Sequence, residues 1–261
     1  MADGKSSKQL LKYLPYISVL CFLLTWELIV DLNVVPNSLL ATPIQVVKLF
    51  FYKLTNIQPD GSILIVHIIT SLKEALIGYS LALLIGIPLG LAMGWFTLAE
   101  GFARPIFELI RPIPPVAWIP LTIFWFGIGI TGKAFIIFLS GMVPAVINSM
   151  VGVRMTNPTY IRMARTYGAK DWEIFKNICI PSALPMVFGG LQVALAASWT
   201  TLVAAELIAA DTGLGFLITM GRRLLMPDMI LLGMVLIGLT GVIIGIIVDK
   251  IEKRLVAGVR R

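Results

Sequence analysis

The sequence is poor in charge and in the residue types that perform chemistry. Only 13% of its 261 residues are charged, about half the share of an average soluble domain. One histidine, His67, and two cysteines, Cys21 and Cys179, exclude a histidine-based metal cluster, a zinc finger and a disulfide framework. The phosphate-binding pattern G-x-x-x-x-G-K-[ST] is absent, so the chain carries no P-loop. Catalysis by this chain therefore has no support from its residues.

Apolar residues, by contrast, make up 58% of the chain, and the mean hydropathy is +0.92. A soluble fold of this length buries only about three quarters of its surface, and disordered chains have low hydrophobicity. Both classes are excluded. A membrane-spanning helix needs about 20 apolar residues, and six stretches meet that need: 14–30, 75–98, 112–132, 134–153, 177–205 and 229–248. The sequence predicts an all-α membrane protein with about six transmembrane helices.

A shorter apolar run, 61–72, ends at Lys73 and Glu74 just before the second span. We expect it to be a separate helical lead-in at the membrane surface. The first span follows three lysines but lacks a small-residue cleavage pattern, which favours an uncleaved anchor over a signal peptide.

The positive charges are distributed unevenly between the two sides of the predicted spans. Fifteen of the 21 Lys and Arg residues fall on the side of the N-terminus and six on the other, which predicts that both termini are cytoplasmic. The net charge of +7 is thereby explained without nucleic acid as a partner. We expect a cytoplasmic tail at 1–13, a single transmembrane domain at 14–250 and a basic cytoplasmic tail at 251–261.

Glycine and proline are concentrated in the second and third spans. Helix packing is the simplest explanation for the small residues. The string P-I-P-P-V-A-W-I-P instead predicts a break in the helix, because prolines leave backbone carbonyls without donors. Such backbone is tolerated in a membrane only against protein or a water-filled path. The residues concerned are Gly86, Pro88, Gly90, Gly94, Pro112, Pro114, Pro115 and Pro120.

The loop 154–181, predicted to face the cytoplasm, has a different character. We expect one short helix to begin at Pro158 and to end at Gly168 in a left-handed conformation. A second helix would then begin at Asp171 and end at Pro181.

The second helix would carry Asp171 and Glu173 in its first turn and would present Trp172 and Phe175 to the cytosol. An aromatic face outside the membrane suits docking into a partner's groove. The alternative is an amphipathic segment on the lipid surface.

This loop resembles the EAA loop of ATP-binding cassette (ABC) importer permeases, whose pattern is E-A-A, three residues, Gly, nine residues, I-x-L-P. The chain keeps Ala164, Gly168, Ile178 and Pro181. It has Met163, Arg165 and Ile180 where the family has Glu, Ala and Leu. The resemblance covers nearly the whole chain and narrows to the permeases for nitrate, sulfonates, taurine and bicarbonate through four strings: G-Y-S-L-A-L-L-I-G-I-P-L-G (78–90), R-P-I-P-P-V-A-W-I-P-L (111–121), Y-I-R-M-A-R-T-Y-G-A (160–169) and A-A-E-L-I-A-A-D-T-G-L-G (204–215).

The resemblance implies a MetI-like type I importer fold in a bacterial cytoplasmic membrane. It implies a homodimer, two cytoplasmic ABC ATPase subunits and an extracytoplasmic solute-binding protein. ATP and Mg²⁺ would be used by the ATPase, and this chain would bind no cofactor and no metal. The residues expected to couple the ATPase to the spans are Ala164, Arg165, Gly168, Ala169, Asp171, Trp172, Glu173, Phe175 and Pro181.

Candidates for the transport path lie mainly on the fifth span. Glu206 ends a long uncharged run and is expected either to pair with Arg222 or Arg223 or to act as a gate. Hydrogen-bonding side chains nearby suit a passing anion but are equally typical of contacts between helices. These residues are Asn148, Ser198, Trp199, Thr200 and Thr201.

The function predicted is the permease subunit of an ATP-driven importer for a small anion. Sulfonate-like or nitrate-like cargo is favoured, and bicarbonate and aromatic carboxylates remain open. The alternative is an ion-coupled secondary transporter, which would typically show inverted repeats and intramembrane acids. An intramembrane enzyme would need a nucleophile or metal set that one histidine does not supply.

Overall fold

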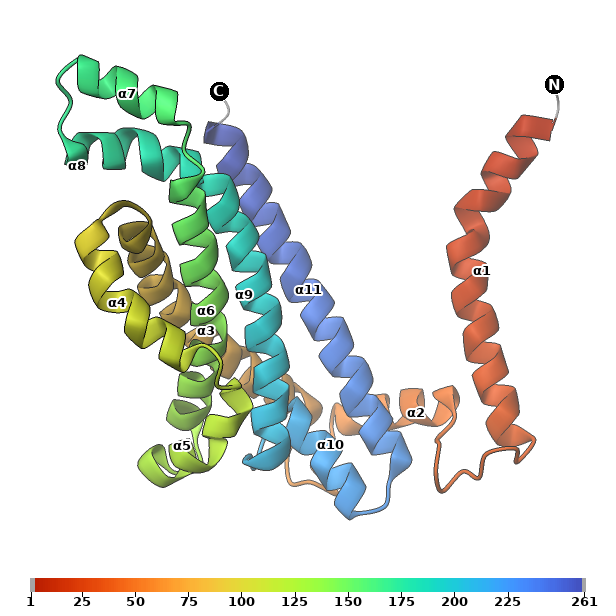
Figure 1. Cartoon of the computed structure of the whole chain (residues 1–261). Coiled ribbons are helices and arrows are strands. Elements are labelled where there is room, and N and C mark those ends of the chain that lie inside the picture. The colour runs from red at the N-terminus through yellow and green to blue at the C-terminus, as the bar shows by residue number, and fades with distance from the viewer. Residues whose placement is uncertain (1–2, 260–261) are drawn as a thin grey trace. The chain divides into compact units, whose positions relative to one another are not determined.

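The structure is a computed structural model that describes the backbone of residues 3–259 and the side chains of 13–251, 253 and 254. Within this part of the chain all regular structure is helical, which confirms the predicted class (Figure 1). The helices are α1 (Asp3–Asp31), α2 (Pro43–Lys53), α3 (Leu64–Trp95), α4 (Thr97–Ile110), α5 (Ile119–Phe126), α6 (Ile130–Arg154), α7 (Pro158–Thr166), α8 (Asp171–Ile174), α9 (Ile180–Ile208), α10 (Leu214–Arg223) and α11 (Pro227–Val259).

The chain divides into two compact units. The first comprises Met1–His67 and Leu217–Leu236, and the second comprises Ile68–Phe216 and Ile237–Arg261. The helices α3, α10 and α11 each contribute residues to both units. The tails expected at 1–13 and 251–261 are, as far as the structure describes them, helical continuations of α1 and α11.

Five helices of the described chain are long and apolar enough to cross a membrane: Tyr13–Asp31, Leu64–Trp95, Ile130–Arg154, Asp171–Ile208 and Pro227–Ile251. The helices Thr97–Ile110 and Pro115–Phe126 meet the same test as a pair bent by 81°, which gives six when the pair is counted as one broken span. The predicted number is therefore confirmed. The break predicted at the proline string is confirmed, because the string forms this bend and a 3-10 turn at Pro115–Trp118. The bounds expected for the third span, 112–132, are wrong, because α5 ends at Phe126 and α6 begins at Ile130.

The separate lead-in expected at 61–72 is also wrong. Helix α3 runs without a break from Leu64 to Trp95 and passes straight through Lys73 and Glu74. Glu74 is tolerated inside the helix because it is buried and forms an ion pair with Lys133 on α6. The sequence pattern shows the charge but not the partner that neutralises it.

Pro181 does not end the second helix of the loop, as we expected. Helix α8 passes through a wide π-helical turn, Phe175–Cys179, directly into α9, and Pro181 lies in the first turn of α9. In the wide turn the N–H of Ile180 donates to the carbonyl of Phe175, five residues back. A proline cannot donate, and the change of hydrogen-bond register just before Pro181 accommodates its missing N–H.

The core of the second unit is formed where α6 packs on α3 and α9. The glycines of α3 lie against α6: a Cβ atom at Gly86 would lie 2.9 Å from the Cβ of Ala145, and one at Gly94 would lie 2.8 Å from the carbonyl oxygen of Met150. These distances are too short for any larger residue. Close helix packing therefore accounts for the small residues of this span.

Candidate functional site

The polar candidates on α9 lie on two different faces of the helix. Ser198 and Thr201 are buried. The Ser198 hydroxyl lies 3.5 Å from the carbonyl of Ile137, and the Thr201 hydroxyl lies 2.8 Å from the Ser140 hydroxyl. Both partners are on α6. These two hydroxyls join helices within the second unit.

Two other candidates are also engaged inside the protein. The indole N–H of Trp199 donates to the carbonyl of Ile237 on α11 at 3.3 Å. The amide of Asn148 donates to the carbonyl of Pro144, one turn earlier on α6, at 2.9 Å. A Cβ atom on Gly190 of α9 would collide with Asn148, so the pair fixes the approach of α6 and α9.

Thr200 lies on the other, exposed face of α9. Between residues 182 and 200 the exposed positions of this helix are Ser182, Pro185, Gly189, Gln192, Val193, Ala196 and Thr200. Except for Val193 they are small or polar. We call the three residues Gln192, Ala196 and Thr200, which are spaced four positions apart, the polar face of α9. Gln192 is absent from the sequence-based candidates, although its spacing of eight residues from Thr200 was available as a signal.

The polar face of α9 borders a groove of about 590 Å³. Its other wall is α11, where Gly241 and Gly245 leave room and Asp249 contributes a carboxylate. The groove lies entirely within the second unit. Lipid-exposed polar side chains are unfavourable in a bilayer, so this surface is suited to water or to another protein chain.

Glu206 is buried and holds the start of α10. Its carboxylate accepts hydrogen bonds from the Ser71 hydroxyl at 2.6 Å and from the backbone N–H of Gly215 at 2.8 Å. The same Ser71 oxygen accepts from the N–H of Leu214 at 2.8 Å. The N-terminus of a helix attracts negative charge, and Lys133 of α6, which pairs with Glu74, supplies a favourable positive charge near Glu206.

The pairing expected between Glu206 and Arg222 or Arg223 is therefore wrong. Both arginines are exposed at the end of α10, whereas the carboxylate is directed to the beginning of that helix. Gly213, with φ of 125°, is required at this contact because a Cβ atom there would overlap the carboxylate of Glu206. Sequence reasoning identified the residue but not its partners.

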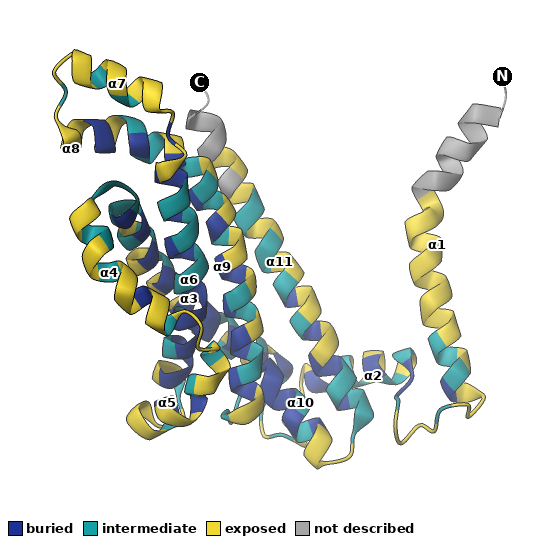
Figure 2. Ribbon diagram, viewed as in Figure 1, coloured by how far each residue is buried: buried dark blue, intermediate teal, exposed yellow. Residues whose placement is uncertain are grey.

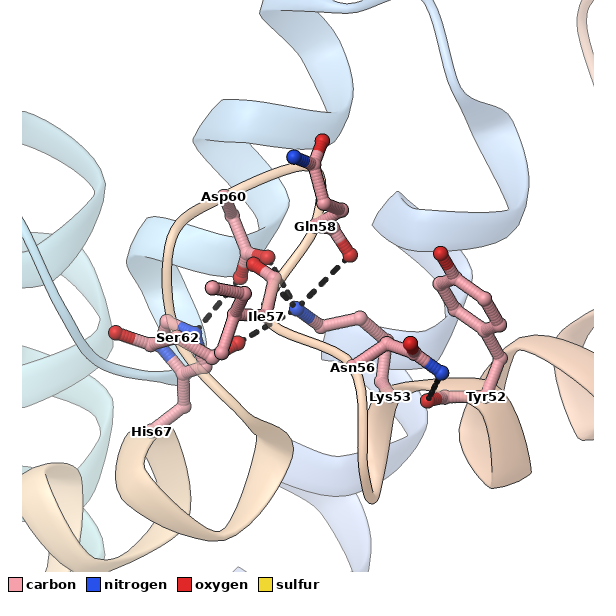
Figure 3. Close-up of polar contacts among 8 residues, drawn as sticks. All are labelled: Tyr52, Lys53, Asn56, Ile57, Gln58, Asp60, Ser62 and His67. Atoms are coloured by element: carbon pink, nitrogen blue, oxygen red, sulfur yellow. Dashed lines mark hydrogen bonds and ion pairs between the residues drawn. The ribbon is translucent and has the colours of Figure 1, made fainter.

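A second buried ionic cluster lies in the first unit and was missed by the sequence analysis (Figure 3). Lys53, at the end of α2, forms an ion pair with Asp60 and donates to the carbonyls of Ser62 at 2.6 Å and Gln58 at 3.3 Å. Asp60 also lies 2.7 Å from Nε2 of His67, in the first turn of α3. All three side chains are fully buried. The cluster joins the end of α2 to the beginning of α3.

The Asp60 carboxyl is the centre of this cluster. Burial by itself raises the pKa of Asp60, but the hydrogen bonds from His67 and Lys53 and their charges outweigh burial and hold that pKa below its usual value. The only signal in the sequence was a Lys, an Asp and a His within fifteen residues, and sequence reasoning predicted no contact between them.

The loop between α6 and α9 has the two short helices that the sequence predicts. Asn157 caps α7 by accepting from the N–H of Thr159 at 2.9 Å. Gly168 has φ of 81° and makes the reversal, as expected. The N–H of Lys170 donates to the Glu173 carboxylate at 2.8 Å at the start of α8, and Arg165 pairs with Asp171 at 3.1 Å across the reversal.

Phe175, however, does not face the cytosol. It is 6% exposed and lies in a core with Trp95 and Phe96 at ring distances of 6.3 and 5.1 Å. Trp172 is 61% exposed, as predicted. Phe175 therefore anchors α8 to the end of α3, and the expectation that it contacts a partner directly is wrong.

The exposed surface of the loop is nevertheless rich in large side chains. Tyr160, Met163 and Tyr167 of the α7 segment are all more than half exposed. Pro181 helps to line a groove of about 410 Å³ beside them. Of the remaining predicted residues, Ala164 and Ala169 are partly buried against the core that contains Phe175. The exposed side chains of Tyr160, Met163, Tyr167 and Trp172 are called the loop surface below.

Comparison with known proteins finds relatives that are described as transport or import permeases. The chain is 35% identical over 243 residues to the taurine transport system permease protein TauC of Escherichia coli K12, covering 92% of this chain and 87% of that protein. It is 30% identical over 246 residues to the putative aliphatic sulfonates transport permease protein SsuC of the same strain, covering 94% and 92%. It is 27% identical over 246 residues to the nitrate import permease protein NrtB of Synechocystis, covering 93% and 88%.

A solved structure shows the same fold. The chain superposes on inward-facing conformations of the MetNI methionine ABC transporter with a TM-score of 0.55 and 19% identity, covering 76% of this chain and 96% of that chain. The family described as "binding-protein-dependent transport system inner membrane component" matches residues 82–261. With several membrane-spanning helices and these relatives, the chain belongs to this family of multi-pass inner-membrane transport permeases.

Proposed function

We propose that this chain is the permease subunit of an ATP-driven importer and forms the path for a small anion of the sulfonate, taurine or nitrate type. Relatives that transport taurine, aliphatic sulfonates and nitrate support this class of cargo. The observation that carries the proposal is the polar face of α9, because an amide side chain such as Gln192, exposed near the middle of a membrane helix, favours water or protein beside it.

In a homodimer, two such faces from two copies would border one central path. The Gln192 amide there would donate to the oxygens of a sulfonate or nitrate without fixing a charge that would trap it. The Thr200 hydroxyl, which donates to the carbonyl of Ala196 at 2.8 Å, would have to leave that carbonyl to donate to the cargo. Three of the six candidates for the path, Ser198, Thr201 and Glu206, stabilise the helix bundle behind that face.

The loop surface of each chain in the homodimer is the proposed docking site for one cytoplasmic ABC ATPase subunit. The two ATPase subunits would bind ATP and Mg²⁺. This chain would bind neither. Helix α8 continues through the π-helical turn into α9, so a displacement of α8 by the ATPase would move the helix that carries the polar face. Phe175, held between Trp95 and Phe96, would pass the same displacement to α3.

Both termini are proposed to be cytoplasmic, as the positive-inside distribution predicts. The solute-binding protein would then deliver cargo on the side that carries α2 and α10. Alternation between outward and inward access requires a cargo affinity that differs between the two states.

Uptake by the reconstituted complex tests the cargo class and the path. Proteoliposomes with ATPase and binding protein should accumulate labelled taurine or nitrate only with ATP. Gln192→Ala should reduce uptake several-fold, while Val193→Ala, an exposed apolar neighbour, should leave it unchanged. Accumulation of taurine or nitrate that is driven by an ion gradient without ATP would overturn the proposal in favour of a secondary transporter.

The docking site has its own test at Gly168. A residue with a Cβ atom pays about 1 kcal/mol or more to hold the left-handed conformation, so Gly168→Val should tilt α8 and weaken attachment of the ATPase or uncouple hydrolysis from uptake. Gly101→Val, on α4 with open space around it, is the matched control. Full retention of ATPase and of coupled uptake in Gly168→Val would exclude the loop surface as the coupling element.

A further inference from the structure

Helix α2 exposes an apolar stripe that the transport path does not use. Ile44 and Val47 are each 54% exposed and Phe51 is 63% exposed. At about 100° per residue these three side chains lie on one side of the helix. The opposite side holds Val46 and Lys53, which are buried within the first unit.

Both ends of α2 are fixed to ends of membrane spans. At its beginning, the N–H of Ile44 donates to the carboxylate of Glu27 at 3.3 Å, and the carbonyl of Ala41 accepts from the Trp26 indole at 3.1 Å. Glu27 and Trp26 belong to the last turns of the span Tyr13–Asp31. At its end, Lys53 is joined through Asp60 to His67, in the first turn of the span Leu64–Trp95. The helix therefore lies at the depth where both spans leave the bilayer.

The polar side chains of α2 are placed as they are in helices that lie on membranes. Lys48 and Tyr52 are exposed on the edge next to the apolar stripe, and both have an apolar stem with a polar end. They border a groove of about 740 Å³ whose other wall includes Met226, Pro227 and Asp228. One edge of the helix thus faces polar surroundings, and the stripe faces away from the buried side.

We propose that α2 is an interfacial helix whose stripe Ile44, Val47 and Phe51 is embedded in the lipid at the boundary between headgroups and acyl chains. The occupant of the stripe is the lipid bilayer, because both ends of the helix are fixed at the ends of apolar membrane spans and the stripe is itself apolar and exposed. Helices of this kind bury their apolar face about 5–10 Å into the interface. The buried cluster of Lys53, Asp60 and His67 then fixes α2 at the level of α3.

Accessibility of spin labels in lipid nanodiscs tests this placement. Single cysteines would replace Val47, Phe51 or Lys48 in the full complex, with Cys21 and Cys179 changed to alanine. Nitroxides at 47 and 51 should collide several-fold more with oxygen, which concentrates in lipid, than with a water-soluble nickel chelate. The label at 48, one residue from 47 but on the polar edge, should show the lower ratio of the matched control.

Two outcomes would overturn the proposal. Equal ratios at 47, 48 and 51 would place the stripe in water. Immobile labels at 47 and 51 that neither quencher reaches would mean that protein covers the stripe, either a second copy or the binding protein. A second variant guards against misfolding by the labels: Phe51→Leu, which keeps the stripe apolar, should behave as the unmodified chain, whereas Phe51→Glu should lower the recovery of assembled complex from membranes.

Discussion

The helices α9 and α11 pack on each other, yet they expose opposite kinds of surface. Ile244 and Val248 of α11 contact the core that contains Ala194 and Leu195 of α9. On its outer side α11 exposes Leu239, Ile243 and Ile247, which are each about half exposed and lie four residues apart. On its own outer side α9 exposes Gln192, Ala196 and Thr200.

The contrast distinguishes two uses of a membrane helix. Large apolar side chains at half exposure fit lipid, where they are favourable to insertion. Small and polar side chains at the same depth gain nothing from lipid and fit a hydrated path or a close protein neighbour. Figure 2 shows that both helices alternate buried and exposed positions along their length. Exposure alone therefore does not distinguish a lipid-facing surface from the wall of a transport path. The chemistry of the exposed residues distinguishes them.

The largest expected effect comes from placing the same charge on each face. Leu239→Asp on α11 would put a carboxylate against lipid near the middle of the span, at a cost of about 2.5–3.5 kcal/mol on insertion scales. We expect little of this variant to assemble in membranes. Ala196→Asp on α9 should assemble normally but lose most anion uptake, because its charge repels the cargo. Membrane recovery and uptake per complex measure the two effects, and equal loss of assembly in both variants would remove the contrast.

The buried side of α9 should respond through stability rather than transport. Glu206→Ala leaves Ser71 and the N–H of Gly215 without their partner, and each buried unsatisfied group costs about 1–3 kcal/mol. Thermal unfolding of the purified complex should shift to lower temperature by several degrees, with uptake per folded complex nearly unchanged. Glu206→Gln keeps an acceptor and should be milder. A loss of uptake at normal stability in Glu206→Gln would instead assign this residue to gating.

The loss of stability in acid that comes from the buried cluster around Asp60 should be the same in variants of the α9 face and of the α11 face. Because the pKa of Asp60 is held below its usual value, this group adds stability above the ordinary carboxyl pKa of about 3.9. That stability is lost as the pH falls through the lowered value. Asp60→Asn should reduce stability at neutral pH and flatten the decline in acid, as melting temperatures measured from pH 7 down to about pH 2 would show. Unchanged acid dependence would contradict the role of the buried cluster.

Hydropathy was sufficient to predict the number of spans because it depends on each residue alone, but it did not predict where the second span begins or where the third is divided. The loop helices were predictable too, since Pro158 and Gly168 act through their own backbone. Partners were not predictable: Phe175 was expected at the surface and lies in a core with Trp95 and Phe96. Glu206 was expected beside an arginine and caps a helix instead. The partners of Phe175 lie about 80 positions away in the sequence, and Ser71, a partner of Glu206, lies 135 positions away. Gly215, the other partner of Glu206, is brought back to it by a turn of the chain. A linear pattern contains neither kind of contact.

Adjacent residues give the smallest and most direct test of the contrast. Thr200 and Thr201 have the same side chain, but Thr200 is exposed on the polar face and Thr201 is buried with its hydroxyl 2.8 Å from Ser140. Thr201→Val removes one buried hydrogen bond, worth about 1 kcal/mol, so it should lower the melting temperature slightly and leave uptake intact. Thr200→Val exchanges a hydroxyl for a methyl group of similar size on the polar face and should leave the melting temperature unchanged while uptake falls about two-fold. Measured together on one preparation, melting and uptake should each change in only one of the two variants. If Thr200→Val changes stability, or if Thr201→Val changes uptake, the two faces do not divide transport from stability in the way that their exposed chemistry indicates.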